Sequence, residues 1–173
     1  MQRLSDIAGK IKLALGVLLI VSFFLPWVAQ TPSCLDKSVI IRDNISGYSL
    51  AADGIMPKVL LAPAFGTVVA ALALIFRGTK KPLARSIASL IESPSAVLLM
   101  IYIDLVVRLF TPFVVRYGYI IAGGLFWAIA AVSLSEVVIH FPRLTKTGRI
   151  IVAALAAVIA GLLLIDYLSR LLT

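Results

Sequence analysis

Five long apolar runs, separated by short polar connections, constrain the fold of this chain more than any other feature of its sequence. The runs cover residues 11–28, 59–76, 95–110, 119–139 and 150–168. A helix needs about 20 apolar residues to cross the ~30 Å hydrocarbon core of a bilayer. Of the 173 residues, 61% are hydrophobic and 14% are charged. We therefore predict an all-α, polytopic transmembrane helix bundle of about five spans, with residues 1–173 forming a single domain.

Basic residues are distributed unevenly between the two sides of the predicted membrane. One side collects Arg3, Lys10, Lys12, Arg77, Lys80, Lys81, Arg85, Arg143, Lys146 and Arg149. The other side has only Lys37, Arg42, Lys58, Arg116 and Arg170. Because cytoplasmic connections are enriched in Lys and Arg, this pattern predicts a cytoplasmic N-terminus and, with five spans, an external C-terminus. We expect a multi-pass protein of the bacterial inner membrane.

Residues 29–57 form the only sizeable extramembrane loop that the sequence predicts. Within it, residues 38–42 have a β-branched centre, and the turn-forming residues Asp43 and Asn44 follow. Such a run next to a turn is typical of a short hairpin. We predict a small β-hairpin in the outer loop that covers one end of the bundle.

Two opposite charges, Asp104 and Arg108, lie one helical turn apart inside the third apolar run. A charge within a bilayer is costly and needs a reason. If the helix starts near Ser95, the pair lies deep in the membrane and indicates a proton or ion relay, or a contact with a partner helix. If the helix starts near Leu83, the pair lies at the outer interface. The structural alternative is a local ion pair, with Arg108 extending towards the surface.

The same spacing recurs at Asp166 and Arg170, near the outer end of the last run. One hypothesis places four residues in a single outer polar cluster: Asp104, Arg108, Arg116 and Asp166. Which helices pack together cannot be read from one sequence, so this cluster depends on the packing. At the opposite side, Glu136 and His140 share a helical face, where a carboxylate and an imidazole can bind a metal or pass a proton. Two ligands do not make a metal site, and we expect a solvated helix end there.

Small residues at four-residue spacing form stripes on three of the predicted spans. They are Ala62, Gly66 and Ala70 in the second, Gly124 and Ala128 in the fourth, and Ala153, Ala157 and Gly161 in the fifth. Such stripes let helices approach closely in lipid. They indicate either packing within the bundle or docking onto another membrane subunit.

Several function classes receive no support from the sequence. The net charge of +8 comes from residues between apolar runs rather than from one basic face, so we expect no nucleic-acid partner. One cysteine and one histidine exclude an intramolecular disulfide and a multi-histidine site. The chain has no phosphate-binding Gly-rich loop, no HExxH, no Gly-x-Ser-x-Gly and no CxxC motif, so we predict neither an enzyme nor a cofactor.

Two hypotheses about function remain. The first is a non-catalytic multi-pass subunit or accessory protein of a membrane complex, whose partners besides lipid are other subunits or further copies of itself. The alternative is a small oligomeric transporter or channel that uses Asp104 and Arg108.

Overall fold

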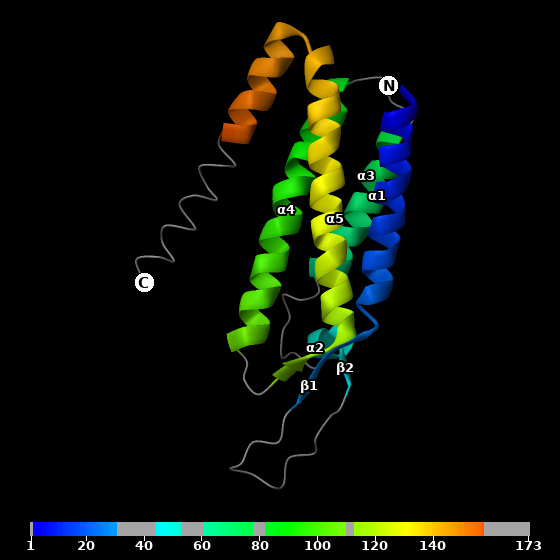
Figure 1. The fold of residues 1–173 in the computed structure, drawn as a ribbon, viewed down its shortest axis with the longest axis vertical. Helices are drawn as coiled ribbons and strands as arrows, with labels where there is room; N and C mark the ends of the chain where they lie inside the picture. The colour runs from blue at the N-terminus through cyan, green and yellow to red at the C-terminus, as the bar shows by residue number, and fades with distance from the viewer. Residues whose placement is uncertain (1, 31–43, 53–60, 78–81, 110–112, 158–173) are drawn as a thin grey trace, which may run out of the picture.

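Long helices lie side by side along the long axis of the molecule (Figure 1). The computed structural model describes residues 2–30, 44–52, 61–77, 82–109 and 113–157. The helices are α1 (Gln2–Ser22), α2 (Gly47–Ala52), α3 (Leu61–Arg77), α4 (Pro82–Leu109) and α5 (Tyr117–His140), followed by the short 3-10 helix η2 (Phe141–Arg143). Residues 146–157 are again helical. α1 packs on α3 and α5, and α4 packs on α5.

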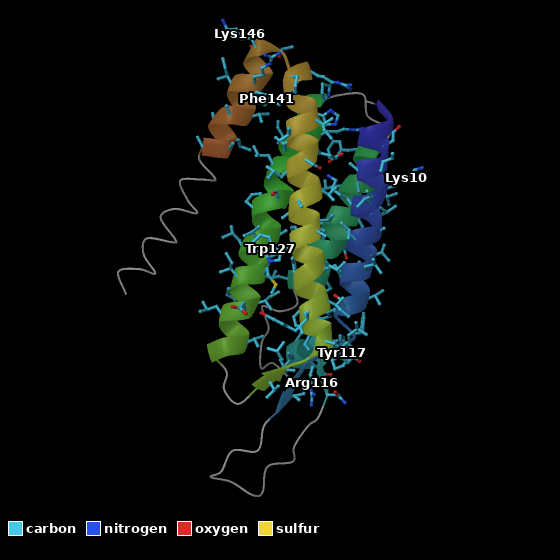
Figure 2. All side chains as sticks on the ribbon, viewed as in Figure 1. Lys10, Arg116, Tyr117, Trp127, Phe141 and Lys146 are labelled. Carbon is cyan, nitrogen blue, oxygen red and sulfur yellow. The ribbon has the colours of Figure 1, made fainter. Side chains whose placement is uncertain are left out.

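The bundle has two ends of different character. The start of α1, the start of α4 and the end of α5 lie together, and we call this the N-terminal end (Figure 1). The opposite end carries a small antiparallel sheet and is called the sheet end. The Lys146 side chain extends from the first and Lys10 lies on α1 in the same half of the bundle, whereas Arg116 and Tyr117 lie at the second (Figure 2). The described part is thus mostly helical, with a minor β component.

The sheet has the strand order β2-β1-β3, with β1 (Pro26–Gln30) in the centre, β2 (Ile45–Ser46) on one side and β3 (Phe113–Val115) on the other. Val28 pairs with Ile45 and with Val115. Residues 45–46 of the predicted outer loop therefore form a strand of a sheet. The central strand of that sheet, β1, comes from the end of the first apolar run. The predicted hairpin over residues 38–42 lies outside the described residues.

The first helix ends earlier than the sequence predicted. We expected it to continue to residue 28, whereas α1 ends at Ser22 and Trp27 belongs to β1. The Trp27 indole Nε1 donates to the carbonyl oxygen of Ser22 at 2.8 Å, so this carbonyl at the end of the helix accepts a second hydrogen bond in addition to that from the backbone N–H of Leu25 at 3.2 Å. The ring is 1% exposed and packs edge-on against Phe23 and Tyr119. Side-chain burial and sheet pairing thus outweigh continuation of the helix.

The third apolar run belongs to a longer helix than its hydropathy marks. The sequence left two possible starts for this helix, near Ser95 and near Leu83. The start near Ser95 is wrong, because α4 begins at Pro82. Proline suits the first turn of a helix, where its missing N–H would have no partner. Pro94 lies inside α4 without ending it. Asp104 consequently lies close to the C-terminal end of the helix, near the sheet end.

Apolar side chains fill the bundle between the sheet and the middle of the helices. Leu19 of α1, Phe23 directly after that helix, Trp27 of β1, and Phe126 and Ile129 of α5 are each 2% exposed or less. They belong to one continuous cluster. The sheet-end half of the interior is therefore packed with large apolar groups.

Two of the described helical segments, Pro82–Leu105 and Tyr117–Arg143, are long and apolar enough to cross a membrane, and Leu61–Phe76 is a shorter apolar helix. Many large apolar side chains on the outside of the bundle are exposed, among them Trp127 at 59%, Ile120 at 66% and Ile75 at 64%. Apolar groups thus cover the outside of the helices as well as filling the space between them.

Candidate functional site

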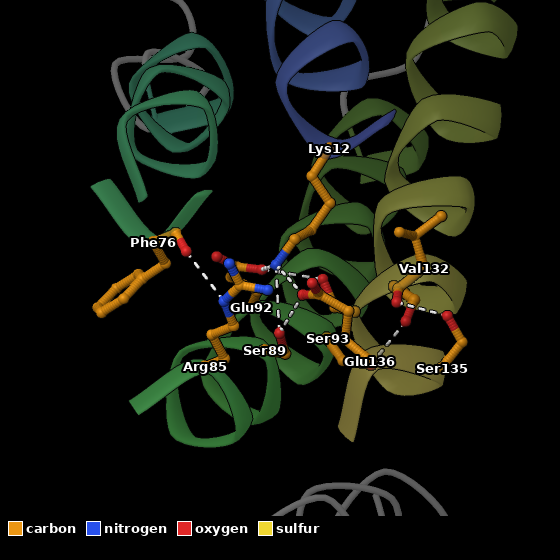
Figure 3. Close-up of polar contacts among 11 residues, drawn as sticks. Lys12, Phe76, Arg85, Ser89, Glu92, Ser93, Val132, Ser135 and Glu136 are labelled. Atoms are coloured by element: carbon orange, nitrogen blue, oxygen red, sulfur yellow. Dashed lines mark hydrogen bonds and ion pairs between the residues drawn. The ribbon is translucent and has the colours of Figure 1, made fainter. Parts of the chain in front are cut away.

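A buried group of charged and hydroxyl side chains joins three helices in the N-terminal half of the bundle (Figure 3). We call it the ionic cluster, and its members are Lys12 of α1, Ser89 and Glu92 of α4, and Ser133 and Glu136 of α5. None of them is more than 4% exposed. Buried charges are retained only when they are paired, so this cluster is the most unusual polar feature among the described residues.

The ammonium group of Lys12 bridges the two carboxylates. Its Nζ lies 2.7 Å from Oε2 of Glu92 and 2.6 Å from Oε2 of Glu136. It also donates to Oγ of Ser89 at 3.2 Å. Lys12 thus makes hydrogen bonds to Glu92 and Ser89 and an ion pair with Glu136, although its side chain is almost completely buried.

The two serines connect the helices reciprocally. Ser89 of α4 donates its hydroxyl to Oε2 of Glu136 at 2.7 Å. Ser133 of α5 donates to Oε2 of Glu92 at 3.0 Å. Each serine precedes the glutamate of its own helix by one turn, and the helices are antiparallel, so each serine faces the glutamate opposite. The arrangement gives each carboxylate a hydroxyl donor in addition to the lysine.

A second buried cation, Arg85, lies beside the cluster. It is 9% exposed, and its Nε donates to the carbonyl oxygen of Phe76 near the end of α3 at 2.9 Å. Its guanidinium also approaches Asp6 at 3.9 Å, but the Asp6 side chain is 55% exposed, so this contact contributes little. Arg85, Lys12 and Glu136 line the same small pocket. With Glu92 they form a group of two cations and two anions.

Glu136 and His140 do not form the solvated helix end that the sequence predicted. Glu136 is 3% exposed and His140 is 4% exposed. η2 and the following helix fold back beside α4, and Leu144 and Val152 of this segment pack with Leu90 and Val137 in a second apolar cluster. This segment encloses the end of α5. Among the described residues, no three His, Cys, Asp or Glu side chains are placed to hold a metal ion.

The predicted outer cluster is described only in part. Asp104 is half-buried, and one of its oxygens accepts a hydrogen bond from the Tyr119 hydroxyl of α5 at 2.6 Å. Arg116 is exposed at the sheet end, where its backbone N–H donates to the carbonyl oxygen of Trp27 at 2.8 Å. The Arg108 side chain and Asp166 lie outside the described residues. Asp104 thus joins α4 to α5, and the four-residue cluster stays a prediction.

We expect Tyr119→Phe to lower the free energy of unfolding by about 1–2 kcal/mol, because it removes a hydrogen bond to a carboxylate. Tyr117→Phe is the matched control, since Tyr117 is 56% exposed and should tolerate the change. Titration of both variants with a denaturing detergent, followed by circular dichroism, measures the difference. Equal stability of the two variants would contradict a structural role for the Tyr119 hydroxyl.

The small-residue stripes occupy different environments. Ala62, Gly66 and Ala70 are buried, and Gly66 lies directly against Gly16 of α1. On α5, Gly124 is exposed, a β-carbon added there would meet no atom within 4 Å, and Ala128 is half-buried. Ala153 and Ala157 are exposed, whereas Gly161 lies outside the described residues. Only the stripe on α3 therefore lies in a helix contact within the described bundle.

Sequence reasoning missed most of the ionic cluster. Lys12 was counted among the basic flanks, and Ser89, Glu92 and Ser133 were assigned no role. One signal was available: the tetrapeptides Ser-Leu-Ile-Glu and Ser-Leu-Ser-Glu, at residues 89–92 and 133–136, place a serine one turn before a glutamate in two apolar helices.

No protein family model, curated protein or solved structure matches this chain.

Proposed function

We propose that this chain is a non-catalytic, multi-pass subunit or accessory protein of a bacterial inner-membrane complex. One observation carries the proposal: the ionic cluster is followed, towards the sheet end, by the closed apolar layer of Leu19, Phe126 and Ile129. An ion pathway through a single copy would need polar groups or water along its whole length. In the described part of the chain, buried charge is confined to one end, which favours a structural role over transport.

The exposed apolar surface supports a membrane location. Exposed Leu, Ile, Val and Trp side chains cover α1, α3, α4 and α5. In water a continuous apolar surface of this kind promotes association, whereas lipid solvates it. The two long apolar helices support this location. We extend the proposal to five spans, one for each apolar run of the sequence.

The charge asymmetry supports an N-terminal end in the cytoplasm. Lys10 and Lys146 are exposed in that half of the bundle (Figure 2), and Arg143 and Arg149, which follow the end of α5 in the sequence, are exposed as well. Lys12 and Arg85 are buried, so they belong to the interior rather than to the surface charge. The remaining excess of Lys and Arg still favours this end as the cytoplasmic one.

A partner should be recoverable from the native membrane. We expect the full chain, purified in mild detergent after cross-linking in cells, to carry a second membrane subunit or another copy of itself in constant ratio. Mass spectrometry of the purified material identifies it. Gly124→Leu tests the open face of α5, because it adds a side chain where no atom lies within 4 Å. Leu134→Ala is its control at another exposed position of the same helix.

Two results would contradict the proposal. One is recovery of a lone monomer under all mild conditions. The other is ion flux by the purified chain in proteoliposomes that disappears in Asp104→Asn, which would instead support the transporter or channel that uses Asp104 and Arg108. The hydrogen bond between Tyr119 and Asp104 already gives that carboxylate a structural partner, so we expect no such flux.

A further inference from the structure

We infer that the turn between α5 and the following helix binds the headgroup of an anionic phospholipid. The turn, residues 141–149, carries three exposed cations, Arg143, Lys146 and Arg149. Residues 137–157 contain no Asp or Glu. Like charges this close along the chain repel one another, and an anion placed among them relieves the repulsion. The inference rests on the membrane location proposed above, because a lipid site needs a bilayer.

The carboxylates that the structure describes near this end of the bundle are committed to other cations. The two glutamates of the ionic cluster are buried and paired with Lys12. Asp6 of α1 approaches Arg85 of α4 at 3.9 Å. Among the described residues, neither Arg143 nor Lys146 has an ion-pair partner. The charge of these two side chains is therefore available to a ligand.

Hydrogen bonds and a buried leucine hold the turn in place. Arg149 donates from Nε to the carbonyl oxygen of Leu144 at 3.1 Å and from Nη2 to that of Pro142 at 2.9 Å. The second bond carries its guanidinium back to the backbone just before Arg143. Lys146 precedes Arg149 by three residues, so the two share one face of the helix. Leu144 is buried in the second apolar cluster, which fixes the turn on the bundle and lowers the entropic cost of binding.

Exposed apolar side chains flank the cations on both sides along the chain. They are Val138 and Phe141 before the cations, and Ile150 and Ile151 after them. Phe141 and Lys146 lie at the same end of the bundle (Figure 2). Cations next to exposed apolar groups match a phospholipid, whose phosphate lies at the membrane surface and whose acyl chains extend into the apolar layer. An acidic segment of a soluble protein would match the cations but not the apolar groups beside them.

Quenching of tryptophan fluorescence by lipids brominated on their acyl chains tests the site in the full chain. Phe141→Trp combined with Trp127→Phe places a reporter at the turn, whereas the unaltered chain has Trp127 exposed in the middle of α5. Trp27 is buried and common to both chains, so it contributes a constant background. At the turn we expect brominated phosphatidylglycerol to bind at least about fivefold more tightly than brominated phosphatidylcholine. At Trp127 we expect equal binding of the two lipids.

Removing the two cations that have no described partner should remove this preference. In the turn-reporter chain, Arg143→Gln with Lys146→Gln should make the two lipids bind equally. Lys10→Gln with Arg116→Gln is the matched control, since both residues are exposed and the chain loses the same charge. The control should keep the preference at the turn. Equal binding before any cation is removed, or the same loss in the control, would overturn the inference.

The two reporters separate the lipid site from the membrane location on which it rests. If neither lipid quenches either reporter, the proposed membrane location is wrong and the site fails with it. If both lipids quench Trp127 but the turn shows no preference, only the lipid site is wrong. A preference at the turn that inorganic phosphate removes, and sodium chloride of equal ionic strength does not, would assign the turn to a free anion and overturn the lipid assignment.

Discussion

Lys12→Met is expected to lower the free energy of unfolding by about 3–5 kcal/mol, the cost of leaving a buried charge without its partner. The substitution keeps an unbranched apolar stem but removes the ammonium that bridges Glu92 and Glu136. Two carboxylates then face one buried cation, Arg85. Denaturing-detergent titration of the purified chain measures the loss.

Lys10→Met is the matched control, because Lys10 is exposed on the same helix two residues away. Its effect should stay within about 0.5 kcal/mol, as is usual for surface positions. Similar losses of unfolding free energy for Lys10→Met and Lys12→Met would show that the effect comes from the lower net charge of the chain and not from the ionic cluster.

Restoring the charge balance of the ionic cluster should recover part of the stability that Lys12→Met loses. In the double variant Lys12→Met with Glu92→Gln, one cation and one anion are removed together, so Arg85 and Glu136 again balance. We expect the double variant to be more stable than Lys12→Met alone, because removing both members of a buried pair costs less than breaking it. A double variant that is less stable than either single variant would contradict this electrostatic explanation.

The positions of the helices follow from hydropathy more closely than their ends do. The apolar runs at residues 59–76 and 119–139 coincide with α3 and α5 within a few residues. The end of α1 was missed because residues 26–30 pair with residues 113–115, far away in the sequence. Hydropathy within a window cannot detect a pairing of this kind, and Trp27 is apolar in a strand as in a helix.

The candidate site was harder to predict, for a different reason. Asp104 attracted attention because its neighbours in the sequence are apolar, whereas Lys12, Glu92 and Glu136 lie near the ends of their apolar runs, where charge is expected. Their burial depends on α1, α4 and α5 meeting at the ionic cluster. A single sequence does not show which helices come together, so it cannot show which charges lose contact with water.

Gly16→Val should destabilise the contact between α1 and α3 by about 3 kcal/mol, at the upper end of the usual cost of overpacking. A β-carbon at Gly16 would lie 2.8 Å from the carbonyl oxygen of Gly66 and 3.1 Å from the β-carbon of Ala70. The reciprocal position is equally tight, since a β-carbon at Gly66 would lie 2.9 Å from the carbonyl oxygen of Gly16. Backbone atoms cannot turn aside as a flexible side chain can, so the helices must separate.

Gly124→Val distinguishes this close contact from a general effect of valine in a helix. Gly124 also lies in a long apolar helix, but no atom lies within 4 Å of the added β-carbon. We expect its free energy of unfolding to change by at most about 0.5 kcal/mol. If Gly16→Val were as well tolerated as Gly124→Val, α1 and α3 would not approach each other as closely as the structure describes.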